Sequence, residues 1–173
     1  SKKRTVAAQA AARGPLREMP AELIEQLVQG PMTPNEVQDL FLSFQKAVVE
    51  RAMNVEMSHN LGYKSGQDKP DGQTNERNGA SGKTVLTDSG AMRIDVPRDR
   101  SGSFEPILIP KHERRFTGFD DKIIAMYARG MSVREIQGFI AESYGTQVSP
   151  DFISSVTDEV MAEAMAWQSR PLE

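Results

Sequence analysis

Residues 84–97 read TVLTDSGAMRIDVP, and this stretch has the pattern of a β-hairpin. Asp88-Ser89-Gly90 is a turn signal between two runs of strand-forming residues. Apolar residues alternate with polar ones in the second run, at Met92, Ile94 and Val96. Pro97 is expected to end that strand, because proline cannot donate to a sheet ladder. Residues 104–109 suit a third, edge strand, so the sequence predicts either a hairpin or a three-stranded sheet.

A long helix is predicted before the hairpin. It begins at Thr33-Pro34-Asn35-Glu36, which combines an N-cap threonine, a proline in the first turn and a capping-box glutamate. An apolar stripe then recurs at three- and four-residue spacing to about His59, at Val37, Leu40, Phe41, Phe44, Val48, Ala52 and Val55. The short helix expected after Pro20 cannot cover a stripe of about 40 Å. The stripe therefore needs a partner, which is either the rest of the chain or a second subunit.

Three shorter helices are predicted after the hairpin. The first covers residues 119–129, and a capping box at Ser132 and Glu135 opens the second. Ser149-Pro150 opens the third. Gly130 and Gly145 separate these helices, and three helices joined by glycine-containing turns are typical of a helix-turn-helix unit. The fold class predicted is mainly α with a small antiparallel β element.

The predicted organisation has five parts. They are a basic flexible arm (1–18), a helical region that could dimerise (19–61), a polar linker (62–82), a small β element (83–110) and a helix-turn-helix region (111–173).

Composition excludes several classes of site. The chain has no cysteine and two histidines far apart, which excludes disulfides and thiolate zinc sites and makes a zinc site of other ligands unexpected. No apolar run approaches the roughly 20 residues of a membrane span, so a cytoplasmic location and no membrane contact are expected. Asp95 is the one acid on the predicted strands of the hairpin, and no phosphate loop, nucleophile elbow or dinucleotide fingerprint occurs. We expect neither catalytic residues, nor a metal site, nor a cofactor in this chain.

Charge is unevenly distributed along the chain. The net charge is −3, and residues 116–160 carry seven acids against three bases. Basic residues gather around the turn after the hairpin, at Arg98, Arg100, Lys111, Arg114 and Arg115. Such a loop suits phosphate contacts, although a solvated loop has the same composition. The third helix of the predicted helix-turn-helix leads with Asp151 and has no Lys or Arg there, so contact with DNA and a packing role both stay open.

Several ordered blocks of this sequence resemble the mutator-type transposases of bacterial insertion sequences. The similar blocks are 77–85, 96–115, 121–137, 148–158 and 167–172, and the resemblance covers roughly residues 30–173. Enzymes of that family cut and join DNA with an Asp-Asp-Glu triad on a ribonuclease-H-like fold that uses Mg²⁺. No triad position maps onto this sequence, so the resemblance implies a catalytic domain after Glu173 and a chain that is inactive alone.

The resemblance implies a DNA-binding and assembly portion that recognises the terminal inverted repeats of an insertion sequence. Double-stranded DNA is the expected partner, with self-association through the long helix. The basic residues around the turn are the predicted phosphate anchors, Ser154 and Ser155 the predicted base readers, and Arg134 a predicted backbone contact. The alternative is an oligomerisation or interaction module with little DNA binding of its own.

Overall fold

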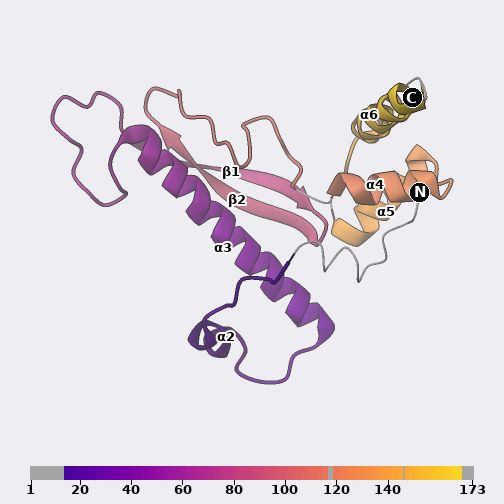
Figure 1. The fold of residues 1–173 in the computed structure, drawn as a ribbon, viewed down its shortest axis with the longest axis horizontal. Coiled ribbons are helices and arrows are strands. Elements are labelled where there is room, and N and C mark those ends of the chain that lie inside the picture. The colour runs from indigo at the N-terminus through magenta and orange to yellow at the C-terminus, as the bar shows by residue number, and fades with distance from the viewer. Residues whose placement is uncertain (1–13, 117–118, 146, 169–173) are drawn as a thin grey trace. The chain divides into compact units, whose positions relative to one another are not determined.

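The computed structural model describes residues 14–116, 119–145 and 147–168. Residues 1–13 of the predicted basic arm and the end of the block 167–172 lie outside the described residues. The elements in chain order are α2 (Ala21–Leu27), α3 (Pro34–Leu61), β1 (Arg77–Thr87), β2 (Gly90–Asp99), α4 (Phe119–Ala128), α5 (Val133–Tyr144) and α6 (Pro150–Gln168) (Figure 1). The described residues fall into two compact units, which divide between Leu40 and Phe41. The predicted class, mainly α with a small antiparallel β element, is confirmed.

The first unit contains α2 and the first turns of α3. The helix predicted after Pro20 is present, and its apolar side chains Ile24, Leu27 and Val28 are exposed. The predicted capping box of α3 is also present. The Thr33 amide donates to the Glu36 carboxylate at 2.7 Å, and the Glu36 amide donates to the Thr33 hydroxyl at 3.3 Å. These reciprocal bonds fix where the long helix begins, because they satisfy amides that the helix itself leaves unpaired.

The core of the second unit lies between α3 and one face of the hairpin, which run alongside each other in Figure 1. Its buried members are Val49, Met53, Val85, Met92, Ile94 and Ile109. Polar contacts fix the helix on the strand, since the Lys46 ammonium donates to the carbonyl of Arg93 at 2.8 Å. The Glu50 carboxylate likewise accepts from the backbone amide of Asp95 at 2.8 Å.

The apolar face of α3 that packs on the hairpin is not the predicted stripe. Leu42, Val49 and Met53 pack there, whereas the stripe residues Phe41 and Val48 are 66% and 50% exposed. The helix has two apolar faces, and much of the packed one is methionine, whose flexible chain fills irregular gaps. Part of the stripe therefore stays open to solvent in this chain.

The hairpin turn is as predicted, but both strands extend further than the sequence indicates. Thr87 pairs with Gly90 across the turn, and Ala80 pairs with Pro97. β2 thus passes through the proline expected to end it, because each strand of a two-stranded ribbon leaves one edge unpaired. β1 begins at Arg77, inside the segment predicted as a linker, and its first residues are exposed and lack apolar alternation.

Residues 104–109 do not form a third strand. The sheet of the described residues has two strands, and the segment is irregular although Phe104 and Ile109 are buried. The reason is visible in its hydrogen bonds. The amides of Ile107 and Leu108 donate to the Glu56 carboxylate on α3, at 2.7 and 3.0 Å, rather than to a neighbouring strand.

The three predicted C-terminal helices are present, and they pack around a second apolar cluster. Its buried members are Leu86, Phe119, Ile123, Met126, Ile136, Ile140, Ile153 and Val156. Ser132 and Glu135 form the predicted capping box, and Gly145 ends α5 in the left-handed region at φ 62°. The hairpin joins this cluster through Leu86, whose amide donates to the carbonyl of Arg114 and whose carbonyl accepts from the amide of Phe116, both at 2.7 Å. Among the described residues, no helix has the length and apolarity that crossing a bilayer requires.

Two isoleucines test this packing with the same chemical change. Ile94 is fully buried between the hairpin and α3, while Ile107 is 87% exposed. Ile94→Ala is expected to lower the free energy of unfolding by about 2–5 kcal/mol, because the deletion leaves a cavity. Ile107→Ala is expected to stay within about 0.5 kcal/mol of the unmodified chain. Urea unfolding followed by circular dichroism measures both, and equal losses would contradict the assigned core.

Candidate nucleic-acid interface

Three of the predicted phosphate-anchoring residues lie around one hollow at the end of the hairpin away from its turn. Arg98, Arg100 and Lys111 line a hollow of about 330 Å³ together with Asn78, Ser81 and Ser101. Arg98 lies near the end of β2 and Arg100 directly follows the strand, while Lys111 lies on the loop after it. The extended pairing of β1 with β2 adds Asn78 and Ser81. The hollow therefore combines cations with neutral hydrogen-bonding groups, and Asp99 and apolar residues such as Phe104 also line it.

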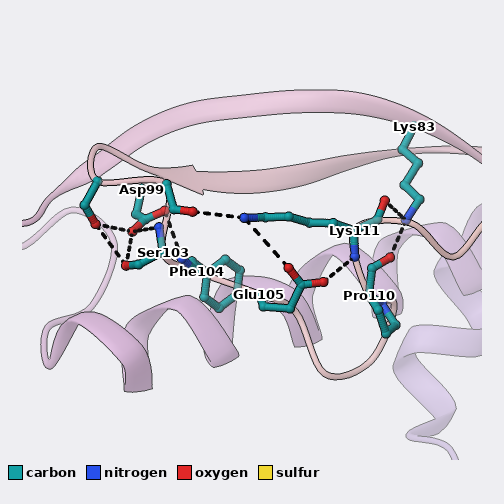
Figure 2. A network of polar contacts seen from close by, with 9 residues as sticks. Lys83, Asp99, Ser103, Phe104, Glu105, Pro110 and Lys111 are labelled. Atoms are coloured by element: carbon teal, nitrogen blue, oxygen red, sulfur yellow. Dashed lines mark hydrogen bonds and ion pairs between the residues drawn. The ribbon is translucent and has the colours of Figure 1, made fainter.

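Asp99 organises the loop on which the hollow depends. The residue is 4% exposed, and its carboxylate accepts hydrogen bonds from the Asn75 amide group at 2.7 Å, the Ser101 hydroxyl at 2.9 Å and the Phe104 amide at 3.1 Å. Ser103 donates to it twice, from its amide at 3.1 Å and its hydroxyl at 2.8 Å (Figure 2). Burial by itself raises the pKa of Asp99, but these hydrogen bonds outweigh it and hold the pKa well below its usual range.

The far end of the same loop is fixed around Lys111. The Glu105 carboxylate accepts from the Lys111 amide at 2.6 Å, and the Lys111 ammonium donates to the carbonyl of Gly102 at 3.0 Å. Lys83 on β1 donates to the carbonyls of Pro110 and Lys111, at 2.6 and 3.1 Å (Figure 2). The loop is thus closed at both ends, so its side chains need little ordering when they meet a ligand.

The charges of the hollow are only partly balanced. Arg100 pairs with Glu76 at 2.6 Å, yet its side chain is 72% exposed, and Lys111 lies 3.8 Å from the Glu105 carboxylate. Arg98 is exposed and has no ion pair within the part of the chain that the structure describes. Pairs as exposed as these hold their partners weakly, so the guanidinium groups remain available to an incoming anion.

Arg114 and Arg115 lie elsewhere, at the junction with the helices. Arg114 is exposed and lines a separate hollow with Ser149 and Phe152 at the start of α6. Arg115 is half-buried. Its guanidinium donates to Glu113 at 3.1 Å and to Asp120 at 3.0 Å, and lies over the Phe152 ring at 5.3 Å.

The predicted helix residues do not line the basic hollow. Arg134 is exposed on α5, and Ser154 is half-buried on α6. Ser155 is exposed, and its hydroxyl donates to the carbonyl of Phe152 at 2.7 Å. The predicted site residues therefore fall into three places, namely the hollow, the junction and the surface of the helices.

Sequence reasoning missed the neutral members of the hollow. Asn78, Ser81 and Ser101 lie in polar stretches, where no spacing rule distinguishes a ligand from a linker residue. The hydrogen bond that joins Asp99 to Asn75 could not be predicted from the sequence either. Within the described residues, no group of three or more His, Cys, Asp or Glu side chains is placed to hold a metal ion.

The family profile described as "Transposase, Mutator family" matches residues 19–173. The transposase for insertion sequence element ISRM3 of Rhizobium meliloti (strain 1021) is 50% identical over 155 residues, which cover 88% of this chain and 38% of that protein. A probable transposase for an ISRM3-like element of Sinorhizobium fredii is 48% identical over the same share of each chain. The transposase for IS256 in transposon Tn4001 of Staphylococcus aureus is 29% identical over 61% of this chain and 27% of its own length.

The chain spans less than two-fifths of the length of the two rhizobial relatives. The residues matched by the family profile include the hairpin, the basic hollow and the three C-terminal helices. Because the profile matches most of the chain and these relatives are about half identical over nearly all of it, the chain belongs to the Mutator family of transposases.

Proposed function

We propose that this chain is the DNA-binding and assembly part of a transposase, and that it recognises the terminal inverted repeats of an insertion sequence. The observation that carries the proposal is the basic hollow, in which Arg98, Arg100 and Lys111 converge on a loop closed at both ends. Family membership supports it, since the matched relatives are transposases for insertion sequence elements.

The hollow would grip the phosphate backbone. A guanidinium offers two parallel N–H groups to the oxygens of one phosphate, and Asn78 and Ser81 add neutral hydrogen-bonding groups. Asp99 would act as a positioning residue, because it holds the loop without touching DNA itself. Arg114 would extend the basic surface toward α6, and Arg115 would do so only in addition to its contacts with Glu113 and Asp120.

The helices would contribute shape and base readout rather than charge. Residues 116–160 carry a net charge of −4, which opposes phosphate attraction. In this proposal Ser154 and Ser155 approach base edges from α6, while Arg134 contacts the backbone. Strand cleavage belongs to the part of the relatives beyond the match, where the family's Asp-Asp-Glu triad with Mg²⁺ would supply the chemistry.

Self-association is a second proposed role, and the exposed face of α3 favours it. Phe41, Val48 and Val55 present apolar side chains to solvent on the helix that the sequence predicts to dimerise. Contiguous exposed apolar side chains of this kind mark interaction surfaces more often than isolated ones do. This role does not depend on DNA.

The hollow is tested by removing its two arginines. The double variant Arg98→Ala/Arg100→Ala is expected to bind duplex DNA roughly tenfold more weakly, with a salt dependence shallower by about two contacts, because two phosphate contacts are lost. Fluorescence anisotropy at several salt concentrations measures both quantities. The control Lys64→Ala/Arg129→Ala removes the same charge from exposed positions outside the hollow. An equal loss in both variants would mean that only net charge matters.

Contacts between α6 and base edges predict that the chain prefers particular DNA sequences. The chain is expected to bind a duplex with its own element's ends more tightly than a shuffled duplex, and Ser154→Ala/Ser155→Ala should narrow that ratio, since each lost base contact costs about 1–3 kcal/mol. Competition anisotropy measures the ratio, with Ser43→Ala on α3 as the control. Equal affinity of the unmodified chain for both duplexes would refute sequence recognition by this chain.

Asp99 predicts a pH dependence of stability. The pKa of this carboxyl is depressed in the folded chain, so its contribution is complete above the unfolded pKa of about 3.9 and is lost as the pH falls further. Asp99→Asn should therefore lower the free energy of unfolding strongly at pH 7 and by a smaller amount near pH 3, where the unfolded carboxyl takes up its proton while the folded one stays ionised. Urea unfolding at both pH values measures this, with the exposed Asp95→Asn as control. A difference that does not change with pH would show that Asp99 is not held as a carboxylate.

A further inference from the structure

The exposed face of α3 has a regular seam. Phe41, Phe44, Val48, Arg51 and Val55 follow one another at alternating spacings of three and four residues, which is the a/d pattern of a coiled coil. Phe41 and Val48 are among the more exposed large apolar side chains of the described residues, and Phe44 is half-buried. Arg51 is the single charged residue within this seam.

The seam cannot be buried by turning the helix. The other face of α3 is already packed, with Val49 and Met53 against the hairpin. The bonds from Lys46 to the Arg93 carbonyl and from the Asp95 amide to Glu50 fix the rotation of the helix. Covering the seam therefore requires something other than the hairpin.

The positions that flank the seam indicate what covers it. Gln45, Ala47, Ala52 and Asn54 occupy the flanking e and g positions, and none is charged. A partner with a charged stripe would find no counterpart at these flanking positions. Small or neutral flanks instead let a second helix of the same kind approach without repulsion between like charges.

The place of Arg51 decides the direction of that second helix. In a parallel pair, Arg51 would meet Arg51 of the second copy in the same layer, and two guanidinium groups would repel one another. In an antiparallel pair centred near Lys46, Phe44 faces Val48 of the second copy, and Phe41 faces its Arg51. Contact between a guanidinium and the face of an exposed phenyl ring is favourable. The seam is therefore complementary to the seam of a second copy that runs in the opposite direction.

We propose that two copies of this chain associate through the α3 seam, with the two helices antiparallel and the Arg51 guanidinium of each copy on the Phe41 ring of the other. The inference deepens the self-association part of the proposed function and is independent of the hollow that would hold DNA. Four central layers form a small interface compared with the roughly 1,200 Å² of a stable one. The dimer is therefore expected to depend on concentration, with a dissociation constant in roughly the micromolar range.

A matched pair of charge insertions tests the face. Val48→Glu places a carboxylate in the seam and is expected to leave the chain monomeric across the concentration range in which the unmodified chain dimerises. Ser43→Glu adds the same charge at an exposed position of α3 outside the seam and should leave dimerisation unchanged. Sedimentation equilibrium measures the mass, and circular dichroism confirms that both variants fold. A monomeric unmodified chain, or equal effects of the two variants, would overturn the proposal.

The absence of cysteine allows the direction to be tested by cross-linking. In the antiparallel pair, the two Ala47 positions flank the same point, whereas the two Val55 positions lie about 27 Å apart at 1.5 Å per residue. A short bis-maleimide should therefore link Ala47→Cys chains and not Val55→Cys chains. Linking at position 55, or a dimer that fails to link at position 47, would overturn the antiparallel register. The DNA affinity of Val48→Glu, measured in parallel, shows separately whether the chain binds DNA without this dimer.

Discussion

The alternation of side chains along the hairpin is the constraint on which residues 41–168 depend. Val85 and Leu86 are neighbours in β1, so their side chains point to opposite faces. Val85 is buried against α3, and Leu86 is buried among α4, α5 and α6. A slip of one residue in the strand would exchange these two faces and lose both clusters at once. The backbone of Leu86 reinforces this arrangement through its pairing with Arg114 and Phe116.

Carboxylates that accept hydrogen bonds from backbone amides also hold the fold together. Glu50 binds the Asp95 amide, Glu56 binds two amides of the irregular loop, and Asp99 and Glu105 close that loop at its ends. Such charge-assisted bonds are stronger than bonds between neutral groups. The same bonds explain how a chain with a net charge of −3 can have a basic hollow. Several of its acids bind backbone amides, while Arg98 and Arg100 remain exposed.

Local signals in the sequence predict much of this fold, and long-range contacts account for what they miss. The capping boxes at Thr33 and Ser132 and the turn at Asp88-Ser89 are encoded within four residues, and all three are present. The sequence around Arg77 does not indicate that β1 begins there, because the first residues of the strand lack apolar alternation. They become a strand through their pairing with β2, which lies later in the chain. The basic members of the hollow could be found from charge alone. Their neutral neighbours and the packed face of α3 could not, since both depend on contacts across dozens of residues.

Arg115 shows that a basic residue near the proposed DNA-binding hollow can have a structural role of its own. Its guanidinium links Glu113 on the loop to Asp120 at the start of α4 and covers the Phe152 ring of α6. Burial raises the pKa of Asp120, and Arg115 opposes that shift from the other side of the ion pair. A phosphate that drew Arg115 away would leave this half-buried carboxylate without its cation, a cost that the exposed Arg98 does not incur. The structure therefore separates the residues that hold the hairpin on the helices from those that are free to grip a ligand.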